Sequence, residues 1–179
     1  MSLQLNAPPA TEPVTLAQAK AWLKVETDDE DALITALIPA ARARAEWHTG
    51  RAFVTQGWTL WLDRVGECVE LPLPPLAGVE SVTLYVADDA ATVLAEDGYR
   101  VDVPGGRLLF KSSHPGLRPR NAAAIAFTCG YGDAADVPAA IASAILLLVA
   151  QLYEHRGDKG APMPDQALAL LAPYRVVRL

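Results

Sequence analysis

One stretch constrains the fold of this chain more than any other: residues 137–156, VPAAIASAILLLVAQLYEHR. From Pro138 to Ala150 only Ser143 is polar, and apolar residues recur at helical spacing on more than one face. A surface helix needs a single apolar stripe, so this one must be covered on several sides, by its own domain or by neighbouring copies. Because the apolar run is shorter than the roughly 20 residues that cross a bilayer, it predicts a buried helix.

The ends of this helix carry their own signals. Asp136 can cap the free amides at the start, and Pro138 suits the first turn, where its missing N–H costs nothing. Gly157 can take the left-handed conformation that ends a helix. We therefore expect the helix to lie between Asp136 and Gly157.

Capping patterns predict two further helices near the N-terminus, after a flexible or extended leader over residues 1–13. In a capping box, a Ser or Thr side chain and a Glu or Gln three residues later satisfy free amides at the helix start. Thr15 with Gln18 fits this pattern and opens a short helix. Thr27 with Glu30 fits it again and opens a second.

The second helix should be long and bent. Its predicted buried line includes Leu37, Ile38 and Ala41 at helical spacing. Pro39 interrupts this line and is expected to bend the helix, because an interior proline removes one backbone hydrogen bond. Gly50 ends the helix.

Residues from about 53 to 130 alternate between apolar and polar, which is the period of a strand. Leu60 and Leu62 alternate with Trp61, and Pro104-Gly105-Gly106 marks a hairpin turn. The pattern fits five or six short strands in a small antiparallel sheet or half-barrel. The fold class predicted is α+β: a helical body of N-terminal helices and a long apolar C-terminal helix, with this β region inserted.

The end of the chain differs in composition from the rest. We expect a single α+β domain over residues 14–157, then over 158–179 a linker, a short helix at 165–171 and a C-terminal arm. The arm mixes apolar and basic side chains in a manner suited to adding a strand or arm to another surface. Its residues are Tyr174, Arg175, Val176, Val177, Arg178 and Leu179.

Charge and composition exclude several classes of protein. The net charge of −6 argues against tight nucleic-acid binding by the whole surface, and the 51% apolar content argues against disorder. The N-terminus lacks the pattern of a secretion signal, so we expect the protein to be kept in a cytoplasm. Cys68 and Cys129 could form one disulfide, although reduced strand residues are the favoured interpretation.

No group of residues predicts catalysis, a metal site or a cofactor site. The histidines lack paired spacing, and the acidic run at 28–31 lacks the pattern of a calcium loop. Cys129 would be a nucleophile only beside a histidine, which nothing in the sequence brings to it. The protein is therefore interpreted as a non-enzyme without cofactors.

Four segments in order resemble one known family. They are VTLAQAKAWLKVETDDEDALITALIPAARARAEWHTGRA, PLPPLAGVESVTLY, AFTCGYGDAADVPAAIASAILLLVAQLYEHR and ALLAPYRVVRL, and together they cover about residues 14–179. The chain resembles the head-tail connector (adaptor) proteins of tailed bacteriophages and gene transfer agents.

The resemblance implies a structural virion protein at the head-tail interface, assembled in the cytoplasm of a bacterial host. Such proteins form a ring of copies of themselves, twelve-membered in the family, beneath the portal protein. The ring joins the capsid to the stopper or tail-completion protein and continues the DNA channel, with no sequence-specific DNA binding and no membrane. The C-terminal arm would reach the portal, with Tyr174, Val176, Val177 and Leu179 as anchors and Arg175 and Arg178 as donors.

Under this resemblance, the two long helices would pack against each other and against neighbouring subunits. The residues expected to do so are Leu37, Ile38, Ala41, Ile141, Ile145, Leu148 and Leu152. An alternative of another class is a stand-alone binding module whose β region recognises a carbohydrate or peptide through Trp58, Trp61 or Tyr85. A third, less favoured, is a small hydrolase that uses Cys129 or an acidic pair.

Overall fold

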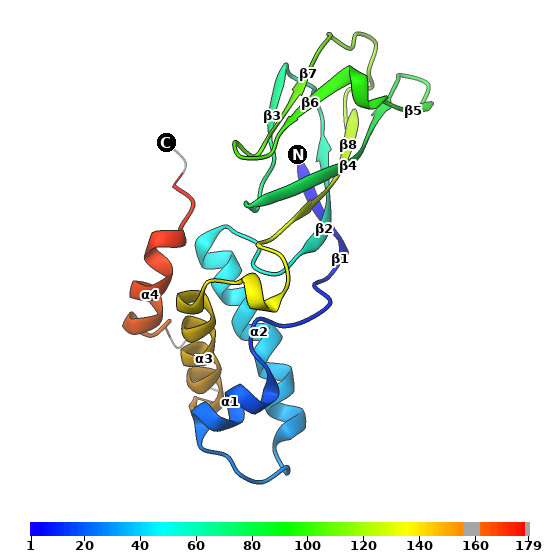
Figure 1. The fold of residues 1–179 in the computed structure, drawn as a ribbon. Coiled ribbons are helices and arrows are strands. Elements are labelled where there is room, and N and C mark those ends of the chain that lie inside the picture. Colours follow the sequence, from blue (N-terminus) through cyan, green and yellow to red (C-terminus); the bar gives the residue numbers. More distant parts are fainter. Residues whose placement is uncertain (156–161, 178–179) are drawn as a thin grey trace. The chain divides into compact units, whose positions relative to one another are not determined.

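A computed structural model describes residues 1–155 and 162–177, and the chain divides into two compact units (Figure 1). The β unit comprises residues 1–10 and 55–131, and the helical unit comprises residues 11–54 and 132–179. The sequence had predicted the β insertion at about 53–130, inside a single domain over 14–157. Within the described residues, no helix has both the length and the apolar character that a membrane span requires.

The β unit contains two antiparallel sheets, where the sequence predicted one small sheet or half-barrel. The larger sheet has the order β1-β2-β8-β4-β5, and the smaller has the order β3-β7-β6. The strands are β1 (Ser2–Ala7), β2 (Gln56–Leu62), β3 (Cys68–Glu70), β4 (Leu76–Tyr85), β5 (Ala91–Val93), β6 (Tyr99–Asp102), β7 (Arg107–Phe110) and β8 (Ala123–Cys129). The mixed α+β class is confirmed.

Apolar residues at every second position of the strands form the buried face of the larger sheet. Leu60 of β2 lies opposite Ile125 of β8, which in turn lies opposite Val82 of β4. All three side chains are fully buried, so one row of branched apolar residues crosses the three central strands. The predicted hairpin is also confirmed, because β6 pairs with β7 around a turn in which Gly106 has a φ of 62°.

Strand β1 occupies part of the predicted leader. It pairs antiparallel with β2, with Leu3 opposite Leu60 and Leu5 opposite Trp58. The N-terminal amine forms an ion pair with Asp63 at 2.8 Å, which holds the start of the strand. The leader is thus extended and forms an edge strand of the sheet.

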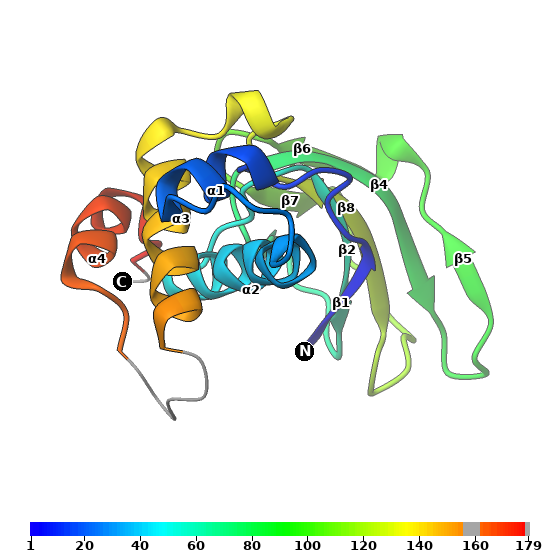
Figure 2. The ribbon, with the colours of Figure 1, turned by 90° about the horizontal axis from the view of Figure 1, so that it is seen from below.

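The helical unit contains four α-helices among the described residues. They are α1 (Leu16–Leu23), α2 (Asp31–Thr49), α3 (Ala139–Glu154) and α4 (Asp165–Leu171), with short 3₁₀ turns at Ala134–Asp136 and Ala172–Tyr174. Helix α3 packs against α1, α2 and α4, and α1 also packs against α2 (Figure 2). The apolar helix α3 is not the last helix of the chain, because the shorter α4 follows it.

Two of the predicted helix ends are confirmed and two are wrong. The Thr15–Gln18 capping box opens α1, and Gly50, with a φ of 70°, ends α2. Helix α2 begins at Asp31 with no side-chain cap, so the predicted Thr27–Glu30 box does not form. Asp136 does not cap α3 either, because its carboxylate accepts the backbone N–H of Asp133 at 2.9 Å. The predicted end at Gly157 and most of the predicted linker lie outside the described residues.

The core of the helical unit is centred on α3. Ile141, Ile145, Leu148 and Val149 have no exposed surface, and every residue from 141 to 153 is buried or half-buried. On α2, Ile34 is likewise fully buried. The near-continuous apolar sequence of α3 is therefore matched by helices on several sides, all from the same chain.

We predict that Ile145→Ala lowers the free energy of unfolding by about 2–5 kcal/mol, because it leaves a cavity in a fully buried site. Urea unfolding followed by circular dichroism at 222 nm would measure this loss in the helical unit. Glu154→Ala, at an exposed position of the same helix, should change the value by less than about 0.5 kcal/mol. Equal effects of the two variants would contradict the assignment of the core.

Candidate interaction surfaces

Most residues predicted to pack neighbouring subunits lie in the core of this chain. The buried ones are Ile38, Ala41, Ile141, Ile145 and Leu148, each at most 4% exposed. Leu37 and Leu152 are half-buried. A side chain without exposed surface cannot touch a second molecule, so any subunit contact made by α2 and α3 has to use other residues of these helices.

Polar contacts hold the helices of this unit together as well. The guanidinium of Arg42 forms ion pairs with Glu12 at 2.8 Å and with Glu46 at 2.7 Å. Burial alone would lower the pKa of Arg42, but the hydrogen bond to Glu12 and the charge of Glu46 raise it above its ordinary value. Tyr153 donates a hydrogen bond from α3 to Glu30, beside the start of α2. These contacts tie α2 to its neighbours through its charged residues.

The described part of the C-terminal arm lies along the end of α2. Arg51 donates a hydrogen bond from Nε to the carbonyl oxygen of Tyr174, and the N–H of Val176 donates to the carbonyl oxygen of Thr49 at 2.8 Å. The last carbonyls of a helix have no partner within the helix, so Val176 supplies a donor that α2 itself cannot provide. The arm is thus fixed by its backbone.

The side chains of the arm are more accessible than its backbone. Arg175 is exposed and Val177 is 74% exposed, whereas Tyr174 and Val176 are half-buried. The predicted arm residues Arg178 and Leu179 lie outside the described residues. The sequence did not identify Thr49 or Arg51 as the site where the arm docks. The only signal for it is the set of carbonyls without a partner that every helix has at its end.

The β unit has an aromatic cluster on the face of the larger sheet opposite Leu60. The rings of Trp61 and Tyr85 lie 5.8 Å apart, and the guanidinium carbon of Arg118 lies 4.1 Å from the centre of the Tyr85 ring. Arg118 is held by Asp89 at 3.0 Å. Of the residues in the carbohydrate or peptide hypothesis, Trp61 and Tyr85 therefore come together. Trp58, three residues from Trp61, lies on the other face of the sheet.

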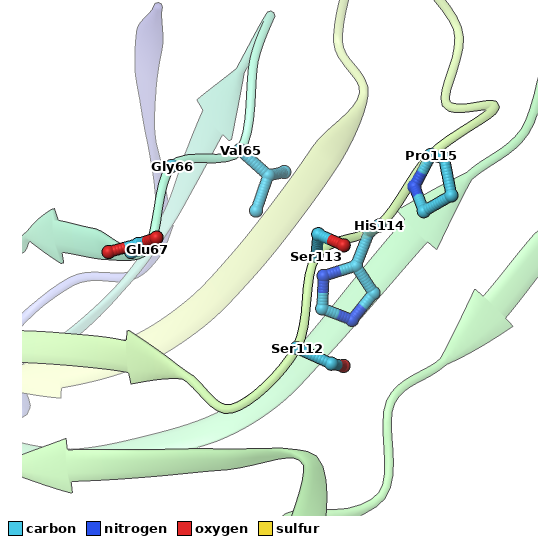
Figure 3. A pocket seen from close by; sticks show the side chains of 7 residues that line it. All are labelled: Val65, Gly66, Glu67, Ser112, Ser113, His114 and Pro115. Carbon is cyan, nitrogen blue, oxygen red and sulfur yellow. The ribbon is translucent and has the colours of Figure 1, made fainter.

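A pocket of about 330 Å³ in the β unit was not predicted from the sequence (Figure 3). Its lining includes Glu67 on one loop and Ser112, Ser113 and His114 on another, residue types that can form a hydrolytic triad. The Nδ1 atom of His114, however, is buried and has no hydrogen-bond partner among the described residues. A triad requires a carboxylate at that nitrogen, so this geometry does not assemble one.

The other candidates from the sequence are the two cysteines and the groups of possible metal ligands. The thiol of Cys129 is buried and donates a weak hydrogen bond to the carbonyl oxygen of Gln56 at 3.8 Å. Cys68 is exposed, and neither of the two cysteines forms a disulfide. Within residues 1–155 and 162–177, no group of three or more His, Cys, Asp or Glu side chains could hold a metal ion.

Residues 13–84 match the family described as phage gp6-like head-tail connector protein. Over its whole length the chain is similar to a chain in the neck of an empty gene transfer agent particle, computed with C6 symmetry. The two are 30% identical with a TM-score of 0.81, over 100% of this chain and 97% of the other. The chain belongs to the head-tail connector family. It has the structural role of a connector in the virion, as the resemblance in its sequence implied.

Further solved structures agree with this assignment. A chain in the virion of a native gene transfer agent particle matches the connector equally well, at 30% identity and a TM-score of 0.81. A chain in the neck of a native particle, computed with C12 symmetry, gives 30% identity and a TM-score of 0.72 over 98% of this chain and 97% of the other. Among curated proteins, none matches the chain. Family membership favours the connector over a stand-alone carbohydrate or peptide module.

We predict that Arg51→Ala loosens the arm of the connector. Hydrogen bonds to charged groups contribute about 1.5–3 kcal/mol, so losing the bond to Tyr174 should speed exchange of the Val176 amide at least about tenfold. Native-state hydrogen exchange, resolved at Val176, would measure this change. Arg118→Ala, which removes a guanidinium from the β unit, should leave that amide unaffected. Unchanged protection in Arg51→Ala would show that the arm is held by other contacts.

Proposed function

We propose that this connector assembles as a ring of twelve copies beneath the portal and joins the capsid to the stopper and tail. The observation that carries the proposal is the match over the full chain to neck structures with cyclic symmetry. Twelve copies fit both the C6 and the C12 symmetry of those necks, because a twelve-fold ring also has six-fold symmetry. DNA would pass through the ring without sequence-specific contacts.

The charge of the connector supports the role of a conduit. With a net charge of −6, the surface as a whole does not attract the DNA backbone, so DNA can slide past it. The proposed role is structural, in the virion at the head-tail interface, without catalysis, a cofactor or a membrane. Assembly would take place in the cytoplasm of the bacterial host, before or during the joining of head and tail.

Within this ring, the helical unit would be the body that packs side by side, and the β unit would be its insertion. Helices α2 and α3 would contribute to the packing through their less buried residues, such as Leu37 and Leu152. The buried residues that were predicted to contact subunits would act indirectly, by holding the shape of the unit.

The arm would bind the portal protein. Arg175 and Val177 are its most accessible described side chains, and Tyr174 and Val176 retain part of their surface. With Arg178 and Leu179 they combine apolar anchors with guanidinium donors, the composition found at the centre of protein interfaces. The described backbone bonds at Tyr174 and Val176 would hold these side chains at the edge of the helical unit.

Electron microscopy of the protein mixed with its portal is the direct test of the ring. We expect closed rings with twelve-fold symmetry on the portal. A free protein that is monomeric would not contradict the ring, because the portal can act as its template. Failure to form any ring on an authentic portal, or normal joining of heads and tails in particles without this protein, would refute the proposal.

Deletion of residues 173–179 should leave a folded protein that no longer binds portal. Among the described residues, 173–177 include no α-helix and none of the buried core, so the circular dichroism spectrum and the melting temperature should stay close to those of the intact chain. A pull-down with purified portal would measure binding. Val93→Ala, at a site 67% exposed in β5, is the matched surface control and should bind normally. Undiminished capture of the truncated protein would refute the role of the arm.

A further inference from the structure

Helix α2 presents an apolar face to solvent. The exposed residues of this helix are Ala32, Thr35, Ala36, Ala40, Ala43 and Trp47, of which all but Thr35 are apolar. Trp47 is 91% exposed, the highest value among the large apolar side chains that the structure describes as exposed. This set, the α2 outer face, lies on one side of the helix because residues three and four apart are neighbours on a helix surface.

The charged residues of α2 are turned inward, which is the reverse of an ordinary surface helix. The side chains of Arg42 and Glu46 are only 12% and 13% exposed, and Arg42 pairs with both Glu46 and Glu12. Arg44 donates a hydrogen bond to Gln151 of α3 at 3.3 Å. Since these polar groups are satisfied within the helical unit, the α2 outer face is left without charge.

This combination is typical of a surface that another protein covers. Alanine side chains let a second backbone approach closely, and an exposed tryptophan offers a large apolar anchor of the kind that dominates binding energy at interfaces. Apolar side chains gathered on one exposed face are typical of an interaction site. Burial of Trp47 would remove from water the largest apolar side chain that α2 exposes.

We propose that the α2 outer face is the surface through which each copy contacts the next copy in the ring. This inference rests on the proposed ring, and the occupant it names is a second copy of this chain. The cyclic symmetry of the matching necks is the reason for that choice, because a closed ring needs a side-by-side contact on every subunit. In rings of more than two copies the contact joins two different patches, so the face meets another part of its neighbour.

The first test introduces a charge into the face while keeping the helix. Ala40→Glu places a carboxylate at an exposed position of α2, and glutamate is a good helix former, so folding should be unchanged. Ala169→Glu, at an exposed position of α4, is the matched control. Portal-templated ring formation, counted by electron microscopy, should fall at least tenfold for Ala40→Glu and stay near the wild-type yield for Ala169→Glu.

The outcomes of this test separate the inference from the proposed function. If the wild-type chain forms no ring on portal, the proposed function fails and the inference fails with it. If the wild-type chain forms rings and Ala40→Glu is no more impaired than Ala169→Glu, only the inference is refuted. Circular dichroism of each variant identifies a folding defect, in which case Trp47→Glu replaces Ala40→Glu under the same criterion.

A second test measures burial of the face directly. Ala43→Cys, in a chain whose exposed Cys68 is replaced by serine, should react quickly with a maleimide in the free protein. Cys129 is buried and should not contribute. On assembly with portal, the reaction at position 43 should slow at least tenfold if a neighbouring copy covers the face. An unchanged rate in the assembled ring would overturn the proposal.

Discussion

The helical unit depends on covering α3. Ile141, Ile145 and Leu148 are fully buried on one face, and every other residue from 141 to 153 is buried or half-buried, so no single neighbour could cover the helix. Helices α1, α2 and α4 surround it, and all three come from the same chain. The side of α2 that faces inward carries Ile34, Ile38, Ala41 and Ala45, so Trp47 and the other alanines of the helix are left outside. The burial of α3 thus determines which side of α2 remains exposed.

The sequence predicted the elements that local pattern controls. The helical period of 137–156 and the strand period around Leu60 and Leu62 both reflect burial, which repeats along an element. Strand β1 escaped detection because all of its residues are exposed, so no buried period marks it. What holds it is pairing with β2, more than 50 residues away, together with the bond from the N-terminal amine to Asp63. Such a non-local partner leaves little trace in a short exposed segment.

The candidate surfaces were harder to predict than the fold, for a related reason. Periodicity shows that Ile38 or Ile145 must be buried, but it does not tell whether the same chain or a neighbour covers it. The structure answers that question in favour of the same chain. Trp47 was visible in the sequence, yet its exposure follows from the tertiary packing that turns Ile34 and Ile38 of the same helix inward. The arm was recognised from composition, while its anchor at Thr49 and Arg51 follows from tertiary structure alone.

The size of the exposed groups bears on how such a ring would form. A face made mostly of alanines buries little area per contact, so a single pair of copies gains little free energy from it. In a ring held on a template, each copy is presented to its neighbours at a high effective concentration, and weak contacts then suffice. The arm is fixed to the end of α2, and the α2 outer face lies on the same helix. Binding of the arm to the portal and contact between neighbouring copies would therefore be coupled. Docking of the arm would bring the faces of adjacent copies together, and the free chain would then not associate before a portal is present.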